Sequence, residues 1–155
     1  YEIVWMGHVL GKRESRRLLG DVIVTEQDVL TNRKFPDACV PTFWGIDLHG
    51  PHPNNTKHFP GQEFLAHADH ANRGNQPFVV PYRSLYSRNI ENLFVAGRCI
   101  SVTHVAHGQT RVIRNTGTMG EAVGLAAVVC RAKGCTPCKV YPEYWNDLTT
   151  LFEGQ

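Results

Sequence analysis

The feature that most constrains the fold is the glycine-rich segment Thr116–Gly124, which opens the long apolar run 125–130. Apolar residues recur there every three or four positions, as on one face of a helix. They are Met119, Ala122, Val123, Ala126, Ala127 and Cys130. Thr118 and Glu121 have the spacing of a capping box, and Gly134 is a suitable stop. The pattern therefore predicts a helix that begins near Thr116 and ends before Gly134.

Glycines at the start of this helix require an explanation, because each costs about 1 kcal/mol relative to alanine in a helix interior. Gly117, Gly120 and Gly124 would let a large group come close to the backbone. Free amides and the positive end of the helix dipole suit an electron-rich group at that point. The alternative is a helix that only packs closely on a sheet, and both interpretations can hold together.

A short apolar run, Leu93–Ala96, precedes the helix and ends in Gly97-Arg98. It lacks polar alternation and is bounded by turn residues, which predicts a parallel strand buried on both faces. Ligands of open α/β sheets bind at the carboxyl ends of strands, where an arginine can reach a pyrophosphate. The alternative for Arg98 is a surface arginine at an ordinary turn.

Three segments together resemble the C-terminal end of FAD-dependent oxidoreductases, distantly akin to the fumarate reductase and succinate dehydrogenase flavoproteins. They are Asn92–Ser101, His107–Arg111 and Thr116–Gly124. Weaker similarity extends upstream, so the resemblance covers most of the chain. The strand–GxGxxG–helix that binds the ADP half of FAD in such enzymes does not occur in this sequence. The resemblance thus implies the C-terminal portion of a flavoenzyme, with the missing N-terminal FAD-binding portion as its partner.

The fold class that the resemblance implies is a partial α/β fold. The last strand and helix of an FAD/NAD(P)-binding Rossmann-type domain would join part of an α+β substrate domain. Residues 1–88 would belong to the substrate-binding domain, with a loop-rich segment at 37–76. Residues 89–134 would be the strand, loop and helix of the FAD-binding domain, and residues 135–155 a tail helix. We expect FAD to be absent from this chain alone, or weakly bound by it.

Local patterns predict further elements in both parts. Strands are expected at Tyr1–Trp5, Asp21–Val24 and Phe78–Val80. A short helix capped by Thr25 should run toward Asn32. A last helix is expected over 141–152, with Pro142 near its start.

The resemblance also implies a set of site residues. The cofactor-binding residues would be Gly97, Arg98, Thr116, Gly117, Thr118, Met119 and Gly120. The amides of Thr116–Gly120 would face the pyrimidine edge of the flavin, where the reduced ring carries negative charge. The catalytic residues would be His107, Arg111 and His104.

The segment His107–Arg111 matches the His-Gly-x-x-Arg pattern of the fumarate reductase relatives, in which the histidine and the arginine hold the substrate. Arginine pairs with carboxylate or polarised oxygen, and histidine can exchange a proton near neutral pH. The implied reaction is hydride transfer between a small organic substrate and the flavin. For each histidine the alternative is a hydrogen-bonded structural role.

Histidine and cysteine spacings raise two rival interpretations. The His-x-x-His pairs are His49/His52, His67/His70 and His104/His107. No His-Glu-x-x-His accompanies them, and a single Cys135-x-x-Cys138 is not a zinc ribbon, so no metal ligands are assigned. A histidine-rich metal-binding protein or hydrolase stays open as an alternative, as does a non-catalytic module that lacks the flavin half.

The charge, hydrophobicity and cysteine content of the chain give no support for a nucleic-acid or membrane partner or for a disulfide framework. A net charge of +2 over 155 residues, without a basic run, gives no case for nucleic acid. No apolar segment approaches the roughly 20 residues that span a bilayer, so no membrane partner is expected. Five cysteines without regular spacing are not a disulfide framework.

Overall fold

The computed structural model describes residues 2–7, 16–51, 66–71 and 77–154, without the side chains of residues 49–51 and 66–71. The elements are α1 (Glu26–Leu30), β1 (Ala38–Thr42), β2 (Ile46–Pro51), β3 (Ala66–Ala71), β4 (Phe78–Pro81), α3 (His104–Thr110), α4 (Ile113–Lys133) and α5 (Pro137–Glu153). Single 3₁₀ turns occur at η1 (Tyr82–Ser84) and η2 (Gly97–Cys99). The chain is thus a mixed α/β structure with little sheet.

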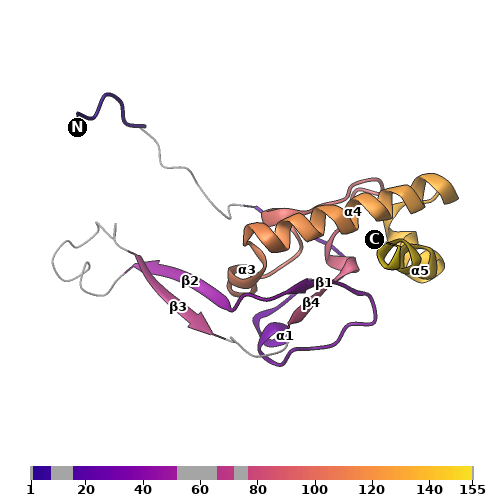
Figure 1. Cartoon of the computed structure of the whole chain (residues 1–155), viewed down its shortest axis with the longest axis horizontal. Helices are drawn as coiled ribbons and strands as arrows, with labels where there is room; N and C mark the ends of the chain where they lie inside the picture. The colour runs from indigo at the N-terminus through magenta and orange to yellow at the C-terminus, as the bar shows by residue number, and fades with distance from the viewer. Residues whose placement is uncertain (1, 8–15, 52–65, 72–76, 155) are drawn as a thin grey trace.

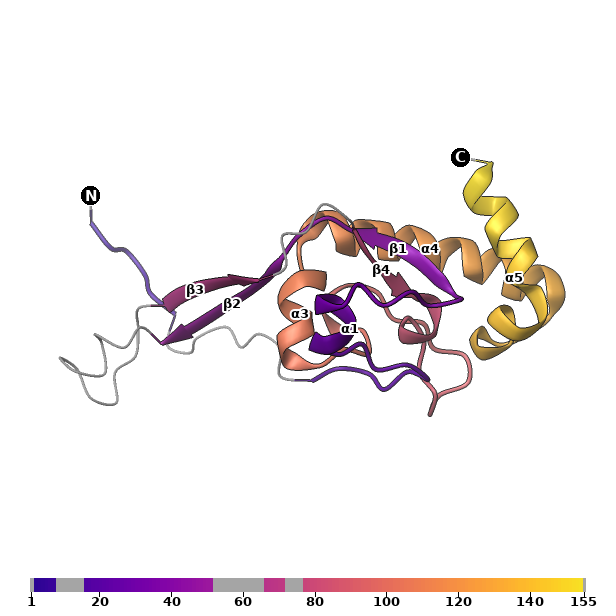
Figure 2. The same ribbon diagram turned by 90° about the horizontal axis from the view of Figure 1, so that it is seen from below.

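The strands form two separate antiparallel pairs, β1 with β4 and β2 with β3. The β2–β3 pair projects from the molecule on the side opposite to α5, while β1 and β4 lie beneath α4 (Figures 1 and 2). Within the segment 37–76, which the sequence predicts to be rich in loops, β1, β2 and β3 occupy residues 38–42, 46–51 and 66–71, while residues 52–65 and 72–76 lie outside the described residues. The prolines in these strands are compatible with them because each strand of a two-stranded sheet is an edge.

The predicted strand at 93–96 is also wrong for this chain. Phe94 forms one isolated antiparallel bridge with Tyr86, and the Val95 amide donates to the Leu85 carbonyl at 2.8 Å. In the described part of the chain no strand lies on either side to extend this pairing. A buried parallel strand needs such neighbours on both sides.

Two other predicted strands fail for the same reason. Of 21–24, only Val24 pairs, in a parallel bridge with Val102. Residues 2–7 have no regular structure, and Ile3, Val4 and Trp5 are 79–92% exposed. Among the described residues nothing provides them with a partner strand.

Helix α4 begins three residues earlier than expected, at Ile113, with Val112 as its N-cap. Thr118 and Glu121 therefore lie inside the helix and do not form a capping box. The buried face is made by Met119, Ala122, Ala126 and Val129. Ala127, expected on this face, is exposed. The predicted stop at Gly134 is confirmed, because this residue has φ +61° and caps the helix.

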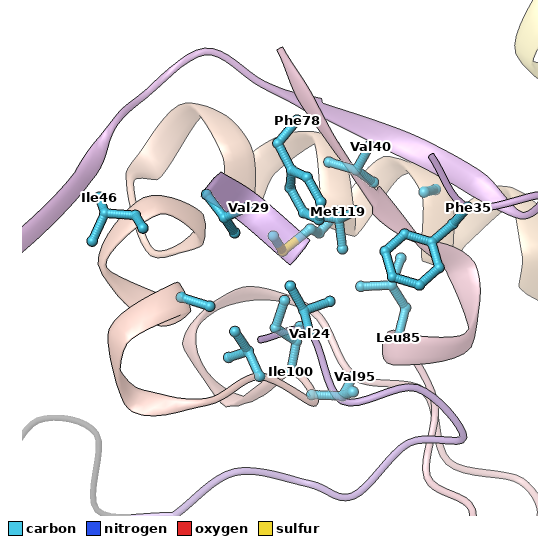
Figure 3. Close-up of a cluster of buried hydrophobic side chains, with 14 residues drawn as sticks. Val24, Val29, Phe35, Val40, Ile46, Phe78, Leu85, Val95, Ile100 and Met119 are labelled. Carbon is cyan, nitrogen blue, oxygen red and sulfur yellow. The ribbon is translucent and has the colours of Figure 1, made fainter. Parts of the chain in front are cut away.

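The core beneath α4 is formed by side chains from almost every element. Met119 of α4 points into a cluster that includes Val29 of α1 and Phe78 of β4 (Figure 3). A second cluster joins the C-terminal half of α4 to α5 around Tyr82, whose hydroxyl donates to the Pro137 carbonyl at 2.8 Å. These two clusters fix α4 on the rest of the molecule.

Several local predictions are confirmed. Thr25 and Asp28 form the capping box of α1, and β4 covers the expected strand at 78–80. Helix α5 begins at Pro137, earlier than expected, and bends at Tyr144, where φ is −133° and ψ is 26°. Pro142 lies inside the helix two residues before the bend, where it removes one helical hydrogen bond.

Candidate functional site

Two segments predicted to contact the flavin meet in one pocket. It has a volume of about 680 Å³ and is lined by Gly97, Arg98, Arg111, Val112, Ile113 and Thr116. The first two residues come from the η2 turn, and the other four from the junction between α3 and α4. The fold therefore brings together four of the residues that the sequence singled out, Gly97, Arg98, Arg111 and Thr116.

The η2 side of the pocket depends on Gly97. Its φ of +84° is a conformation that other residues adopt only with strain, and a Cβ there would have no neighbour within 4 Å. Arg98 follows, exposed to solvent. Its guanidinium has no hydrogen bond or ion pair with the described residues, so it is available to a ligand.

The other side of the pocket is the start of α4. Val112 offers no side-chain cap, and the first turn contains no acidic residue. The amides of the first turn, those of Ile113, Arg114 and Asn115, therefore keep the partial positive charge of a helix N-terminus. The Thr116 amide, in contrast, donates to the Val112 carbonyl at 3.0 Å. The free amides expected at 116–120 are thus displaced by three residues toward the N-terminus.

Arg111 is held in the pocket wall by β2. Its Nη2 donates to the Asp47 carbonyl at 3.2 Å and lies 3.4 Å from the Asp47 carboxylate. Both side chains are 13% exposed. Nη2 is therefore engaged by Asp47, and Nε and Nη1 keep further donors. Sequence reasoning assigned no role to Asp47, since nothing in the local pattern links residues 64 positions apart.

A close approach between α3 and β2 brings Arg111 within reach of Asp47. A Cβ on Gly108 would lie 2.8 Å from the Asp47 carbonyl oxygen and 3.1 Å from its nitrogen. The Gln109 side-chain amide donates to the Trp44 carbonyl at 2.8 Å. The glycine of the His-Gly-x-x-Arg pattern thus allows the backbone contact on which the position of Arg111 depends.

The structure does not bring the two predicted histidines into the pocket wall. His107 is fully buried, with Nε2 3.1 Å from the Arg98 carbonyl. Because a carbonyl only accepts, this nitrogen donates, and the imidazole connects α3 to the η2 turn. His104, at the start of α3, is exposed. Their catalytic roles stay predictions, and His107 is placed to support Arg98.

The remaining predicted cofactor residues lie along α4. Gly117 and Gly120 are exposed, and a Cβ on either would meet nothing within 4 Å. Met119 is buried in the core and Thr118 donates to the Arg114 carbonyl at 3.2 Å. None of these four lines the pocket. The two glycines leave the helix backbone open to a close approach, and their contact with flavin stays a prediction.

Metal ligation has no support within the part of the chain that the structure describes. No group of three histidine, cysteine or acidic side chains there could hold a metal ion. His67 and His70 lie on strand β3 and not on a helix, and His52 lies outside the described residues. No helix in the described ranges has the length and apolar content needed to cross a bilayer.

Comparison with known proteins identifies the family of the chain. The model of the "FAD dependent oxidoreductase" family matches residues 1–149, which include every residue of the pocket. Neither the curated proteins nor the solved structures give a match. The matched range covers nearly the whole chain, so the chain belongs to the FAD-dependent oxidoreductase family.

Proposed function

We propose that the pocket between η2 and the start of α4 is the part of a flavin oxidoreductase site where the flavin ring and the substrate meet. The observation that carries the proposal is the convergence of Arg98, Arg111 and the uncapped N-terminus of α4 on one pocket. Arg98 and the helix N-terminus favour negative charge, while Arg111, whose charge is paired with Asp47, adds hydrogen-bond donors. Family membership supplies the independent support.

FAD fits the chemistry of these groups. Reduced flavin carries negative charge at its pyrimidine edge, which the first-turn amides near Ile113 can stabilise. Such stabilisation raises the reduction potential of the bound flavin. Gly97 keeps the opposite wall free of a Cβ, so a planar ring can approach the backbone. When bound, FAD supplies the acceptor for a hydride from the organic substrate.

Arg111 is the residue best placed to orient that substrate. Its Nε and Nη1 donors can form hydrogen bonds with a carboxylate or a polarised oxygen. Asp47 holds Nη2 and limits the rotation of the guanidinium, which lowers the entropy lost on binding. His107 acts through Arg98, because it fixes the carbonyl of that residue.

The proposal is tested with the chain itself and three ligands: FAD, FMN and ADP. Flavin fluorescence should show weak, saturable quenching by the chain with FAD and with FMN. ADP should not compete, because the pocket would take the ring end of the cofactor and the chain lacks the GxGxxG segment for the ADP half.

Paired arginine variants identify the place of binding. Arg98→Ala should weaken the quenching, whereas Arg88→Ala, which removes an exposed arginine that does not line the pocket, should leave it unchanged. Equal effects of the two substitutions would assign the quenching to nonspecific charge. Competition by ADP would contradict the proposal that the pocket binds the flavin-ring end of the cofactor.

A further inference from the structure

Three cysteines that the proposed site does not use lie close together where α4 gives way to α5. Cys130 is in the last turns of α4, Cys135 follows the helix, and Cys138 is in the first turn of α5. All are half-buried free thiols. Their position is on the second core cluster, beside Tyr82.

The end of α4 brings the backbones of two of these cysteines together. Gly134, with φ +61°, turns the chain back on the helix, and the Cys135 amide donates to the Cys130 carbonyl at 3.0 Å. This is the outer hydrogen bond of a Schellman motif, in which the side chains of the two bonded residues commonly touch. Here those side chains are the thiols of Cys130 and Cys135. Cys138 instead has its sulfur 3.4 Å from Thr136 Oγ1.

We propose that Cys130 and Cys135 are a redox pair that closes to a disulfide when the chain meets a peroxide. The Schellman geometry supplies the proximity that a disulfide requires, and the half-buried sulfurs are within reach of a small oxidant. This inference does not depend on the proposed flavin site, because the pair lies at the opposite end of α4.

The chemistry balances with hydrogen peroxide as the oxidant. Burial and the neighbouring Cys135 raise the pKa of the Cys130 thiol, which disfavours its thiolate. The same disulfide and the same two waters form whichever sulfur meets the peroxide first, and the steps are written here with Cys135 first. The Cys135 sulfur attacks peroxide, the O–O bond breaks, and sulfenic acid and water form. The Cys130 sulfur then displaces the hydroxyl group, which leaves as a second water with the thiol proton, and the S–S bond forms.

Peptide mapping tests the pairing directly. The chain is treated with hydrogen peroxide, denatured, alkylated and digested with trypsin. Cleavage after Arg114, Arg131, Lys133 and Lys139 places Cys130 in peptide 115–131, and Cys135 with Cys138 in peptide 134–139. We expect these two peptides to be joined, with two hydrogens lost and Cys138 alkylated. A disulfide inside peptide 134–139, or alkylation of all three thiols, would overturn the proposal.

Variants separate the proposed pair from a bond between Cys130 and Cys138. Cys138→Ser should keep the joined peptides, and Cys135→Ser should lose them. Gly134→Ala should slow the joining, because alanine disfavours the turn that brings the thiols together. Circular dichroism checks that each variant is folded. Joined peptides in Cys135→Ser would refute the pair.

Discussion

Replacing Gly108 by alanine tests the contact between α3 and β2 that positions Arg111. The new Cβ would lie 2.8 Å from the Asp47 carbonyl oxygen and 3.2 Å from its carbonyl carbon. These are backbone atoms, so no side-chain rotation relieves the clash, and the helix and the strand must move apart. Overpacking of this kind costs about 1–3 kcal/mol. Alanine also favours the helix by up to about 1 kcal/mol, which leaves a net loss of roughly 1 kcal/mol.

Gly124→Ala is the matched control. Gly124 also lies inside a helix, but a Cβ there would meet nothing within 4 Å. Only the propensity gain of about 1 kcal/mol applies. The two variants should therefore differ by about 2 kcal/mol, or roughly 4–8 °C in melting temperature for a chain of this size. Thermal unfolding followed by circular dichroism measures the difference. Equal melting temperatures would refute the close approach of α3 to β2.

Three further predictions concern charged side chains. In a flavoenzyme that contains this chain, Arg111→Lys should retain FAD but lose turnover by about tenfold or more, because lysine keeps the charge without the forked donors of arginine. Each tenfold loss corresponds to about 1.4 kcal/mol. Stopped-flow measurement of flavin reduction checks this, and an unchanged rate would remove Arg111 from the site. Asp37→Ala should lower the free energy of unfolding by about 3 kcal/mol, because it would leave the Arg83 guanidinium unpaired. The buried Asp37 carboxylate accepts two hydrogen bonds of 2.9 Å from that guanidinium. Urea unfolding measures the loss, and a value below roughly 1 kcal/mol would contradict a stabilising role for the pair. Burial acts to raise the pKa of Asp28, but hydrogen bonds led by those from Thr25 outweigh it and hold this pKa below its ordinary value. The stability that Asp28 contributes should therefore be complete above its unfolded-state pKa and lost as the pH falls through its folded-state pKa. Asp28→Asn should make the free energy of unfolding fall less steeply at acid pH, and an unchanged acid dependence would contradict the lowered pKa.

Local signals in the sequence were sufficient where the determinant was local. The capping box of Thr25 and Asp28 and the stop at Gly134 each depend on residues within one turn, and both are observed. The capping pattern at Thr118 was misleading because the uncapped helix starts earlier, at Ile113. The sequence could not indicate a start at Ile113, because Val112 before it has no side chain that can cap a helix.

Partners distant in the sequence were the main source of error. The run 93–96 has the composition of a buried strand, but a strand also needs neighbours, and the described residues supply a single bridge from Tyr86. The sequence pointed to Arg111 through its His-Gly-x-x-Arg pattern. It assigned no role to Asp47, because a lone aspartate carries no signal for an ion pair across 64 positions. Gly108 was the available hint, since a glycine inside a helix indicates a close approach without naming what approaches.

The most direct test of the proposed site is a map of backbone amide shifts on adding FMN to the ¹⁵N-labelled chain. The largest amide shifts are expected at residues that line or border the pocket, which are Gly97, Arg98 and residues 113–116 in the first turn of α4. Arg98→Ala should remove these shifts at the same FMN concentration. Shifts centred on another surface, or a pocket that stays unperturbed while FMN binds, would contradict the assignment of this pocket to the flavin ring.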